Sequence, residues 1–170
     1  VYGGLFIQLF IVYAIVFVLF TRLNPFRFLR KMLPVMLFAF STSSSNATIP
    51  LNLETLERKC GVDEKVASFT IPLGATINMS GTAIMQGVAV VFVAQAFGID
   101  LSTSALMTVV ITAVTAAIGT AGVPGVGTIM LAMVFESVGL PAAGIAMIMG
   151  VDRILDMGRT AVNVTGDAVV

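Results

Sequence analysis

Long apolar runs alternate with short polar breaks along the chain, and the length of each run predicts whether it crosses a membrane. Residues 1–20 carry no charged side chain, and about 20 residues of helix are enough to span a bilayer core of about 30 Å. Residues 66–97 form a second run of sufficient length, interrupted near Asn78. We therefore predict transmembrane helices at 1–23 and 63–98, the second of them broken.

The apolar run at 32–40 is too short to cross a bilayer. About nine residues make roughly 14 Å of helix, half of the hydrocarbon core, and the polar segment 41–46 follows directly. Basic residues cluster at 22–31 and 58–65, so both flanking loops are cytoplasmic by the positive-inside rule. We predict a re-entrant hairpin at 24–62 with its tip buried in protein or lining an aqueous cavity; the alternative is a polar loop lying wholly in the cytoplasm.

A second short run, at 105–118, ends in the glycine- and proline-rich segment 119–127. It predicts a second re-entrant hairpin, at 103–138, entering from the opposite face. Two interrupted hairpins in corresponding positions indicate inverted repeats, with a binding site where their tips meet. The glycine-rich segment lacks the Lys-Ser/Thr ending of a phosphate-binding loop and no strand precedes it, which argues against nucleotide binding.

The final helix, predicted from about Pro141 to 170, carries a polar stripe. Its members are Asp152, Asp156, Arg159, Asn163 and Asp167. At 100° per residue they lie within about 80° of one another, and ionisable groups inside a membrane mark pathways or binding sites. The alternative is a partly solvated helix with ion pairs such as Asp152–Arg153 or Asp156–Arg159, but the apolar residues 144–150 argue against full solvation.

The amino-acid composition is typical of a membrane protein and argues against an enzyme. Of the 170 residues, 58% are hydrophobic and 11% charged, against roughly a quarter charged in average domains. There is no histidine, which removes the commonest general base, and Ser44 has no evident base to activate it. The single Cys60 cannot form a disulfide within the chain. A net charge of zero and the lack of a large basic tract argue against nucleic acid as a partner.

Four motifs, taken in order, resemble the dicarboxylate/amino acid:cation symporters, the family of the archaeal aspartate transporters and the animal excitatory amino acid transporters. They are TSSSNATIP at 42–50, GATINMSGT at 74–82, GTAGVPG at 119–125 and DMGRTAVNVTGD at 156–167. The resemblance covers nearly all of this chain but only the C-terminal half of a family member. The expected fold class is an all-α membrane protein, with transmembrane helices, two re-entrant hairpins in an inverted-repeat arrangement and a broken helix between them.

The resemblance also implies an assembly. Family members are membrane trimers, in which each subunit moves a transport domain against a fixed scaffold like an elevator. This chain would hold most of the transport domain, and the N-terminal scaffold spans would be absent from it. The expected location is the plasma membrane, or the inner membrane of a bacterial cell.

Roles for individual residues follow from the resemblance. Arg159 would bind the side-chain carboxylate of the substrate through its planar guanidinium, and Asp156 would accept from the substrate's amino group. Further substrate contacts would come from Thr82, Thr160 and Asn163, and from the hairpin tips at Ser44, Ser45 and Val123 to Gly127. The implied substrate is an acidic amino acid, aspartate or glutamate.

The implied cation ligands are oxygen atoms, which suit hard cations such as sodium. The candidate residues are Gly74, Thr76, Asn78, Ser80, Ile118, Thr120, Asn163 and Asp167. Among them, Gly74 and Asn78 would act through their carbonyls and Asp167 through its carboxylate. Sodium, in part replaced by protons, would be co-transported, and no organic cofactor is expected.

Two positions depart from the family pattern. The family has Asn-Met-Asp-Gly-Thr where this chain has Ser80 in third place, and a hydroxyl cannot supply the negative charge that offsets a desolvated cation. We therefore hypothesise fewer sodium ions per cycle, or partial replacement by protons. A family arginine is replaced by Ser43 at the position used in archaeal members and by Met157 at the position used in animal members. Arg153, one turn before Met157, is the candidate substitute.

Two alternatives remain at this point. One is a symporter for a neutral amino acid or a C4-dicarboxylate, although Arg159 argues against the first substrate and Asp156 against the second. The other is a channel whose filter is formed by the two hairpin tips.

Overall fold

The computed structural model describes residues 1–169, and all regular structure in this range is helical. The all-α part of the expected fold class is therefore confirmed for these residues. The first rod is formed by α1 (Tyr2–Ile7), a π-helical segment (Gln8–Val12) and α2 (Tyr13–Thr21), which follow one another without interruption. It ends where Arg22 adopts a left-handed conformation with φ 58°.

The next two helices form a helical hairpin. Helix α3 (Pro25–Thr42) begins earlier than the apolar run at 32–40, because the Asn24 side chain accepts from the backbone N–H groups of Phe26 and Arg27. The tip is short. Ser43 ends α3 with φ 53°, and the Ser44 hydroxyl caps α4 (Ser45–Thr55) by accepting from the Ala47 N–H. A π-helical segment (Leu56–Cys60) completes the second arm.

Two consecutive helices follow, separated by a two-residue break. Helix α5 (Glu64–Ile77) ends at Asn78, whose backbone N–H donates to the Gly74 carbonyl at 2.8 Å, and α6 (Ser80–Ala96) begins after Met79. The break therefore lies inside the motif at 74–82. Tyr2–Thr21 and Glu64–Ala96 are long and apolar enough to cross a membrane, by length and composition alone.

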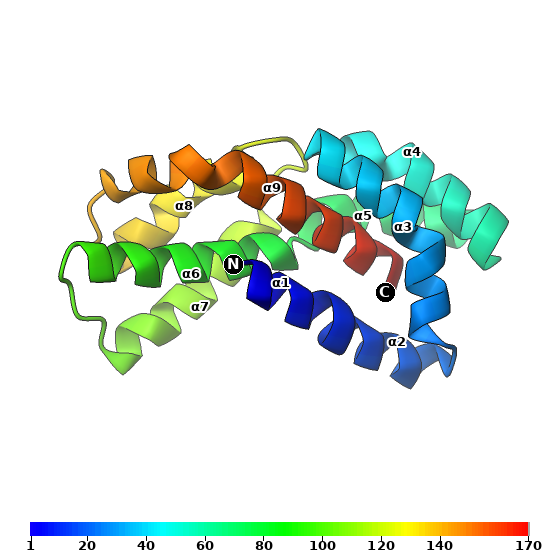
Figure 1. Cartoon of the computed structure of the whole chain (residues 1–170), viewed down its shortest axis with the longest axis horizontal. Coiled ribbons are helices and arrows are strands. Elements are labelled where there is room, and N and C mark those ends of the chain that lie inside the picture. Colours follow the sequence, from blue (N-terminus) through cyan, green and yellow to red (C-terminus); the bar gives the residue numbers. More distant parts are fainter. Residues whose placement is uncertain (170) are drawn as a thin grey trace.

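A second helical hairpin precedes the final helix. Helix α7 (Thr103–Ile118) is capped by Ser102, and α8 (Val126–Ser137) starts after Gly125, which has φ 82° in the left-handed region that favours glycine. Helix α9 (Gly144–Val169) is the longest helix of the described residues, with 26 residues. In Figure 1 the α3–α4 and α7–α8 hairpins lie towards opposite ends of the molecule, and α9 runs between them.

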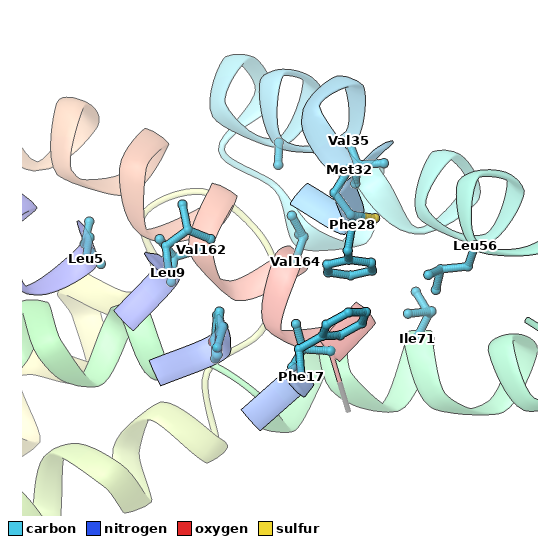
Figure 2. Close-up of a cluster of buried hydrophobic side chains, with 13 residues drawn as sticks. Leu5, Leu9, Phe17, Phe28, Met32, Val35, Leu56, Ile71, Val162 and Val164 are labelled. Carbon is cyan, nitrogen blue, oxygen red and sulfur yellow. The ribbon is translucent and has the colours of Figure 1, made fainter. Parts of the chain in front are cut away.

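Two apolar clusters support this arrangement. Figure 2 shows the first, where the first rod, α3 and α9 meet; the Phe17 and Phe28 rings stack there with centroids 4.5 Å apart, beside buried Met32 and Val164. The second joins α6, α7 and α8 around fully buried Leu131. The outer surface carries many exposed large apolar side chains, as expected of a surface that faces lipid or another apolar partner.

Candidate functional site

The tips of the two hairpins touch each other beside the break and α9. The Ser44 hydroxyl donates to the Gly122 carbonyl at 2.9 Å, and the Asn46 backbone N–H donates to the same oxygen at 3.0 Å. A narrow cavity lies at this junction. It is lined by Ser43, Ser45, Met79, Thr82, Thr120, Ala121, Gly122, Val123, Gly127, Asp156, Thr160 and Asn163. Most of the predicted substrate contacts therefore share one cavity.

Arg159 is not one of the residues that line this cavity, but it contacts Asp156, which is, and it is almost completely buried, with 2% of its surface exposed. Its Nε donates to Asp156 Oδ1 at 3.0 Å, and its Nη2 lies 3.4 Å from Asp152 Oδ1. Its Nη1 is buried and has no hydrogen-bond partner among the described residues. An unsatisfied buried donor is costly, so this nitrogen is suited to an incoming acceptor such as a carboxylate.

Asp156 is the centre of the hydrogen bonds around the guanidinium. Its Oδ2 accepts from the Gly125 backbone N–H at 2.9 Å, and its Oδ1 accepts from the Thr160 hydroxyl at 3.3 Å as well as from Arg159. The acidic side chain thus contacts the second hairpin and α9 at once. Ion pairing of Asp156 with Arg159, foreseen as the alternative reading of the polar stripe, is present, but it is buried rather than solvated.

Asn163 joins α9 to the start of α6. Its Oδ1 accepts from the Gly81 backbone N–H at 2.8 Å, and its Nδ2 lies 3.4 Å from the Thr82 hydroxyl. A Cβ at Gly81 would lie 2.8 Å from the Arg159 carbonyl oxygen, so this close approach requires glycine. The family-like glycine–threonine pair that follows the break therefore positions Thr82 against the polar stripe.

The second hairpin covers the arginine. A Cβ at Gly127 would lie 3.2 Å from Arg159 Nη1 and 3.0 Å from Thr82 Cγ2. The Gly127 carbonyl accepts from Gln86 Nε2 at 3.1 Å, and Gln86 is fully buried. Sequence reasoning missed Gln86; the available signal was an amide in the middle of the apolar helix α6.

Three of the predicted cation ligands come together at the break. Asn78 Nδ2 donates to Asp167 Oδ1 at 3.0 Å, and a Cβ at Gly74 would lie 2.8 Å from the same carboxylate oxygen. Asp167 is 3% exposed. A buried carboxylate beside carbonyl and amide groups is an oxygen-rich environment of the kind that hard cations prefer.

Ser80 has a partner that the sequence did not indicate. Its hydroxyl lies 2.5 Å from the Tyr13 hydroxyl of the first rod, and the Tyr13 ring also packs against Gly166. The position at which the family carries an acid is thus occupied here by a neutral hydroxyl pair. Tyr13 was missed because a single tyrosine in an apolar span carries no spacing signal.

The remaining candidates lie further from this cluster. The Thr76 hydroxyl donates to the Leu73 carbonyl within α5 and the side chain is exposed, as is that of Ile118. Thr120 is buried and donates to the Ala116 carbonyl. Arg153 is exposed on α9, and Asp152 pairs with Arg159 rather than with Arg153. The structure therefore does not bring Arg153 into the buried network of residues 1–169.

Comparison with known proteins agrees with this picture. The model of the sodium:dicarboxylate symporter family matches residues 1–170. Excitatory amino acid transporter 3 of Mus musculus is 46% identical over 168 residues, which is 99% of this chain and 32% of the relative. Neutral amino acid transporter A of Bos taurus is 43% identical over 165 residues, 97% of this chain and 31% of the relative.

A more distant animal relative gives the same coverage. An excitatory amino acid transporter of Caenorhabditis elegans is 42% identical over 168 residues, 99% of this chain and 33% of the relative. The chain thus spans about a third of the length of the curated relatives it matches. These relatives are transporters and not enzymes, as the sequence predicted, and their family implies an integral membrane protein. The match to the family model over the whole chain confirms the resemblance seen in the four motifs: the chain belongs to the sodium:dicarboxylate symporter family.

Proposed function

We propose that this chain is the transport-domain part of a secondary-active symporter that couples uptake of an acidic amino acid, aspartate or glutamate, to the flow of sodium, protons or both. The observation that carries the proposal is the buried Arg159, whose Nη1 has no hydrogen-bond partner within residues 1–169 and lies close to Gly127 of the second hairpin. The unpartnered Nη1 of this guanidinium is available to donate a charge-assisted hydrogen bond to a carboxylate.

The neighbouring groups suit the rest of an amino acid. Asp156 offers carboxylate oxygens that now accept from Gly125 and Thr160, and an ammonium group is a stronger donor to a carboxylate than a backbone N–H. Thr82 and Asn163 offer a hydroxyl and an amide in the same cavity. An amino acid with a second carboxylate can pair that carboxylate with Arg159 and its ammonium group with Asp156.

For the coupled ion we propose sodium at the site formed by the Gly74 and Asn78 carbonyls and the Asp167 carboxylate. Thr76, Ile118 and Thr120 would add ligands near the hairpin-two tip, and Ser80 and Asn163 would line the same region. Because Ser80 is neutral and paired with Tyr13, we propose that the cation site to which the family's acid at this position contributes is weakened. Fewer sodium ions per cycle, or partial replacement by protons, then follow.

For the transport cycle we propose an elevator movement in a homotrimer of the plasma membrane. The α3–α4 and α7–α8 hairpins would be re-entrant and related as inverted repeats, with α7–α8 as the external gate. The contact between Ser44 and Gly122 supports a gate that closes on the other hairpin tip. Scaffold spans that complete the subunit would lie outside this chain.

The test is uptake by the full-length protein reconstituted in lipid vesicles. Radiolabelled aspartate should accumulate saturably under an inward sodium gradient, and unlabelled glutamate or aspartate should compete while neutral amino acids and C4-dicarboxylates do not. Preferential competition by alanine or serine would overturn the acidic assignment in favour of the alternative that the 43% identical neutral amino acid transporter supports. Flux that neither saturates nor accumulates substrate would favour a channel.

A further inference from the structure

Two carboxylates of α9 each bond both to Arg159 and to the second hairpin. Asp156 pairs with Arg159 Nε through Oδ1 and accepts from the Gly125 backbone N–H through Oδ2, at 3.0 and 2.9 Å. Asp152, one turn earlier, pairs with Arg159 Nη2 at 3.4 Å and accepts a hydrogen bond from the Thr128 hydroxyl. Thr128 lies in the first turn of α8. The arginine and the hairpin are therefore joined through the same two acids.

We propose that Asp152 and Thr128 are positioning residues, which tie the orientation of the Arg159 guanidinium to the seating of the second hairpin on α9. The inference rests on the proposed function, because that function assigns Arg159 to the substrate carboxylate. With Nε and Nη2 both held by carboxylates, the plane of the guanidinium is fixed. In the part of the chain that the structure describes, Nη1 then remains as the one nitrogen of this side chain that is buried without a hydrogen-bond partner.

Burial shows why Thr128 is needed. The side chain of Asp152 is 16% exposed, whereas that of Arg159 is 2% exposed, so Asp152 lies nearer the edge of the network. Thr128 is 6% exposed. Its hydroxyl donates to the Asp152 carboxylate and so holds that carboxylate towards the buried Arg159. Hydrogen bonds to charged groups are among the stronger ones in proteins.

The hairpin also covers the free corner of the arginine. Gly127, the neighbour of Thr128, packs so closely that a Cβ would lie 3.2 Å from Arg159 Nη1. If the hairpin lifts, Thr128 leaves Asp152 at the same time as Gly127 uncovers Nη1. Both carboxylates therefore hold the guanidinium of Arg159 in place only when the hairpin is seated on α9. Binding of the substrate carboxylate and closure of the hairpin then favour each other.

The test uses the full-length protein in vesicles, with initial rates of radiolabelled aspartate uptake measured over a range of concentrations. Thr128→Val keeps the shape of the side chain but removes the hydroxyl, and we expect KM to rise about tenfold with Vmax nearly unchanged. Thr128→Ser keeps the hydroxyl and should stay near the wild-type KM. Thr115→Val is the matched control, because the Thr115 hydroxyl donates to the Ile111 and Thr112 carbonyls of its own helix.

A double-mutant cycle shows whether Thr128 acts through Asp152. In an Asp152→Ala background, Thr128→Val should change KM by less than about twofold, since interacting residues are not additive. Thr128→Ala, which also lacks the hydroxyl and has high helix propensity, replaces the valine variant if that variant does not fold. Full additivity, an unchanged KM in the variants that lack the hydroxyl, or a serine variant as impaired as the valine variant would overturn the inference. A wild-type protein that does not accumulate aspartate would instead overturn the proposed function.

Discussion

The Ser44 hydroxyl donates to the Gly122 carbonyl at 2.9 Å, across 78 positions of sequence. This hydrogen bond joins the tips of two helical hairpins that are distant in sequence, and the Asn46 N–H donates a second hydrogen bond to the same oxygen. One carbonyl thus accepts from both sides of the first tip. In a transporter of the proposed kind, such a contact stabilises the closed position of the second hairpin even when no substrate is bound.

The close packing at this contact predicts that Gly122→Ala impairs uptake. A Cβ at Gly122 would lie 2.6 Å from Asn46 Oδ1 and 3.0 Å from the Ala75 carbonyl oxygen. Overpacking of this kind costs about 1–3 kcal/mol, and here the second tip has to move away. We expect a rise in KM for aspartate of about tenfold, measured by uptake into vesicles. Gly119→Ala is the control, since its nearest atom would be 3.7 Å away; equal effects of the two substitutions would contradict the explanation.

Arg159→Gln should abolish uptake of acidic amino acids. The substitution removes the donor for the substrate carboxylate and leaves Asp152 and Asp156 without their shared cation. Breaking a buried ion pair costs about 3–5 kcal/mol, so we expect at least a 100-fold loss in uptake efficiency and a lower melting temperature. Arg58→Gln is the matched control, because the ion pair of Arg58 with Glu54 is exposed. Acidic uptake that survives Arg159→Gln would reject the assigned role.

Asp167→Asn should uncouple uptake from sodium. Asparagine keeps the size of the side chain and its contact with Asn78 but removes the only carboxylate of the proposed cation site. Desolvated cations need such a charge, so the sodium concentration for half-maximal uptake should rise at least tenfold. The comparison is Asp100→Asn, in an exposed loop position. Sodium dependence that is equal in both variants would exclude Asp167 as a ligand.

Ser80→Asp should increase sodium coupling. The substitution restores a carboxylate at the position where this chain has a hydroxyl paired with Tyr13, and a new negative charge beside Asp167 favours an additional cation. We expect a steeper dependence of the uptake rate on sodium concentration than in the wild type. The reference measurement is the sodium stoichiometry of the wild-type protein, from flux ratios at fixed gradients. A wild-type stoichiometry equal to that of archaeal family members would reject the weakened site.

Arg153→Ala tests whether this arginine replaces the one that the family carries elsewhere. Arg153 is exposed and lies next to Asp152 in sequence, so it can act on an acidic substrate only through its long-range field. Such effects are small and are screened by salt. We expect a KM for aspartate about two- to fivefold higher at low ionic strength, and a smaller difference at high ionic strength. An unchanged KM at both would reject the substitution hypothesis.

The helical architecture was accessible from the sequence because it depends on local pattern. The uncharged run at 1–20 predicted one rod, and the glycines and polar residues around Asn78 predicted a break that the structure places at Asn78 and Met79. The apolar run alone did not mark the start of a helix. Helix α3 begins at Pro25, close to the start of the segment 24–62 and well before the apolar run at 32–40, since the Asn24 cap and the proline favour a helix start there.

The polar stripe of α9 shows what the local sequence pattern could not predict. Helical periodicity placed Asp152, Asp156 and Arg159 on one face, but it did not decide which acid pairs with which base. In the structure Asp152 pairs with Arg159, two turns away, while its neighbour Arg153 faces outward. Only packing against α8 decides this, because Thr128 holds the Asp152 carboxylate from the facing hairpin.

By itself, the sequence determined the helical class, the membrane character, the family and most of the residues around the cavity. Periodicity, apolar length and motif order are properties of neighbouring positions, so one chain suffices to detect them. The contacts of Tyr13, Gln86 and Thr128 were decided by tertiary structure alone. Each is a polar side chain with apolar neighbours in sequence, and its partner comes from a segment distant in sequence. Such partners are selected by the free energy of satisfying buried polar groups after the helices have packed.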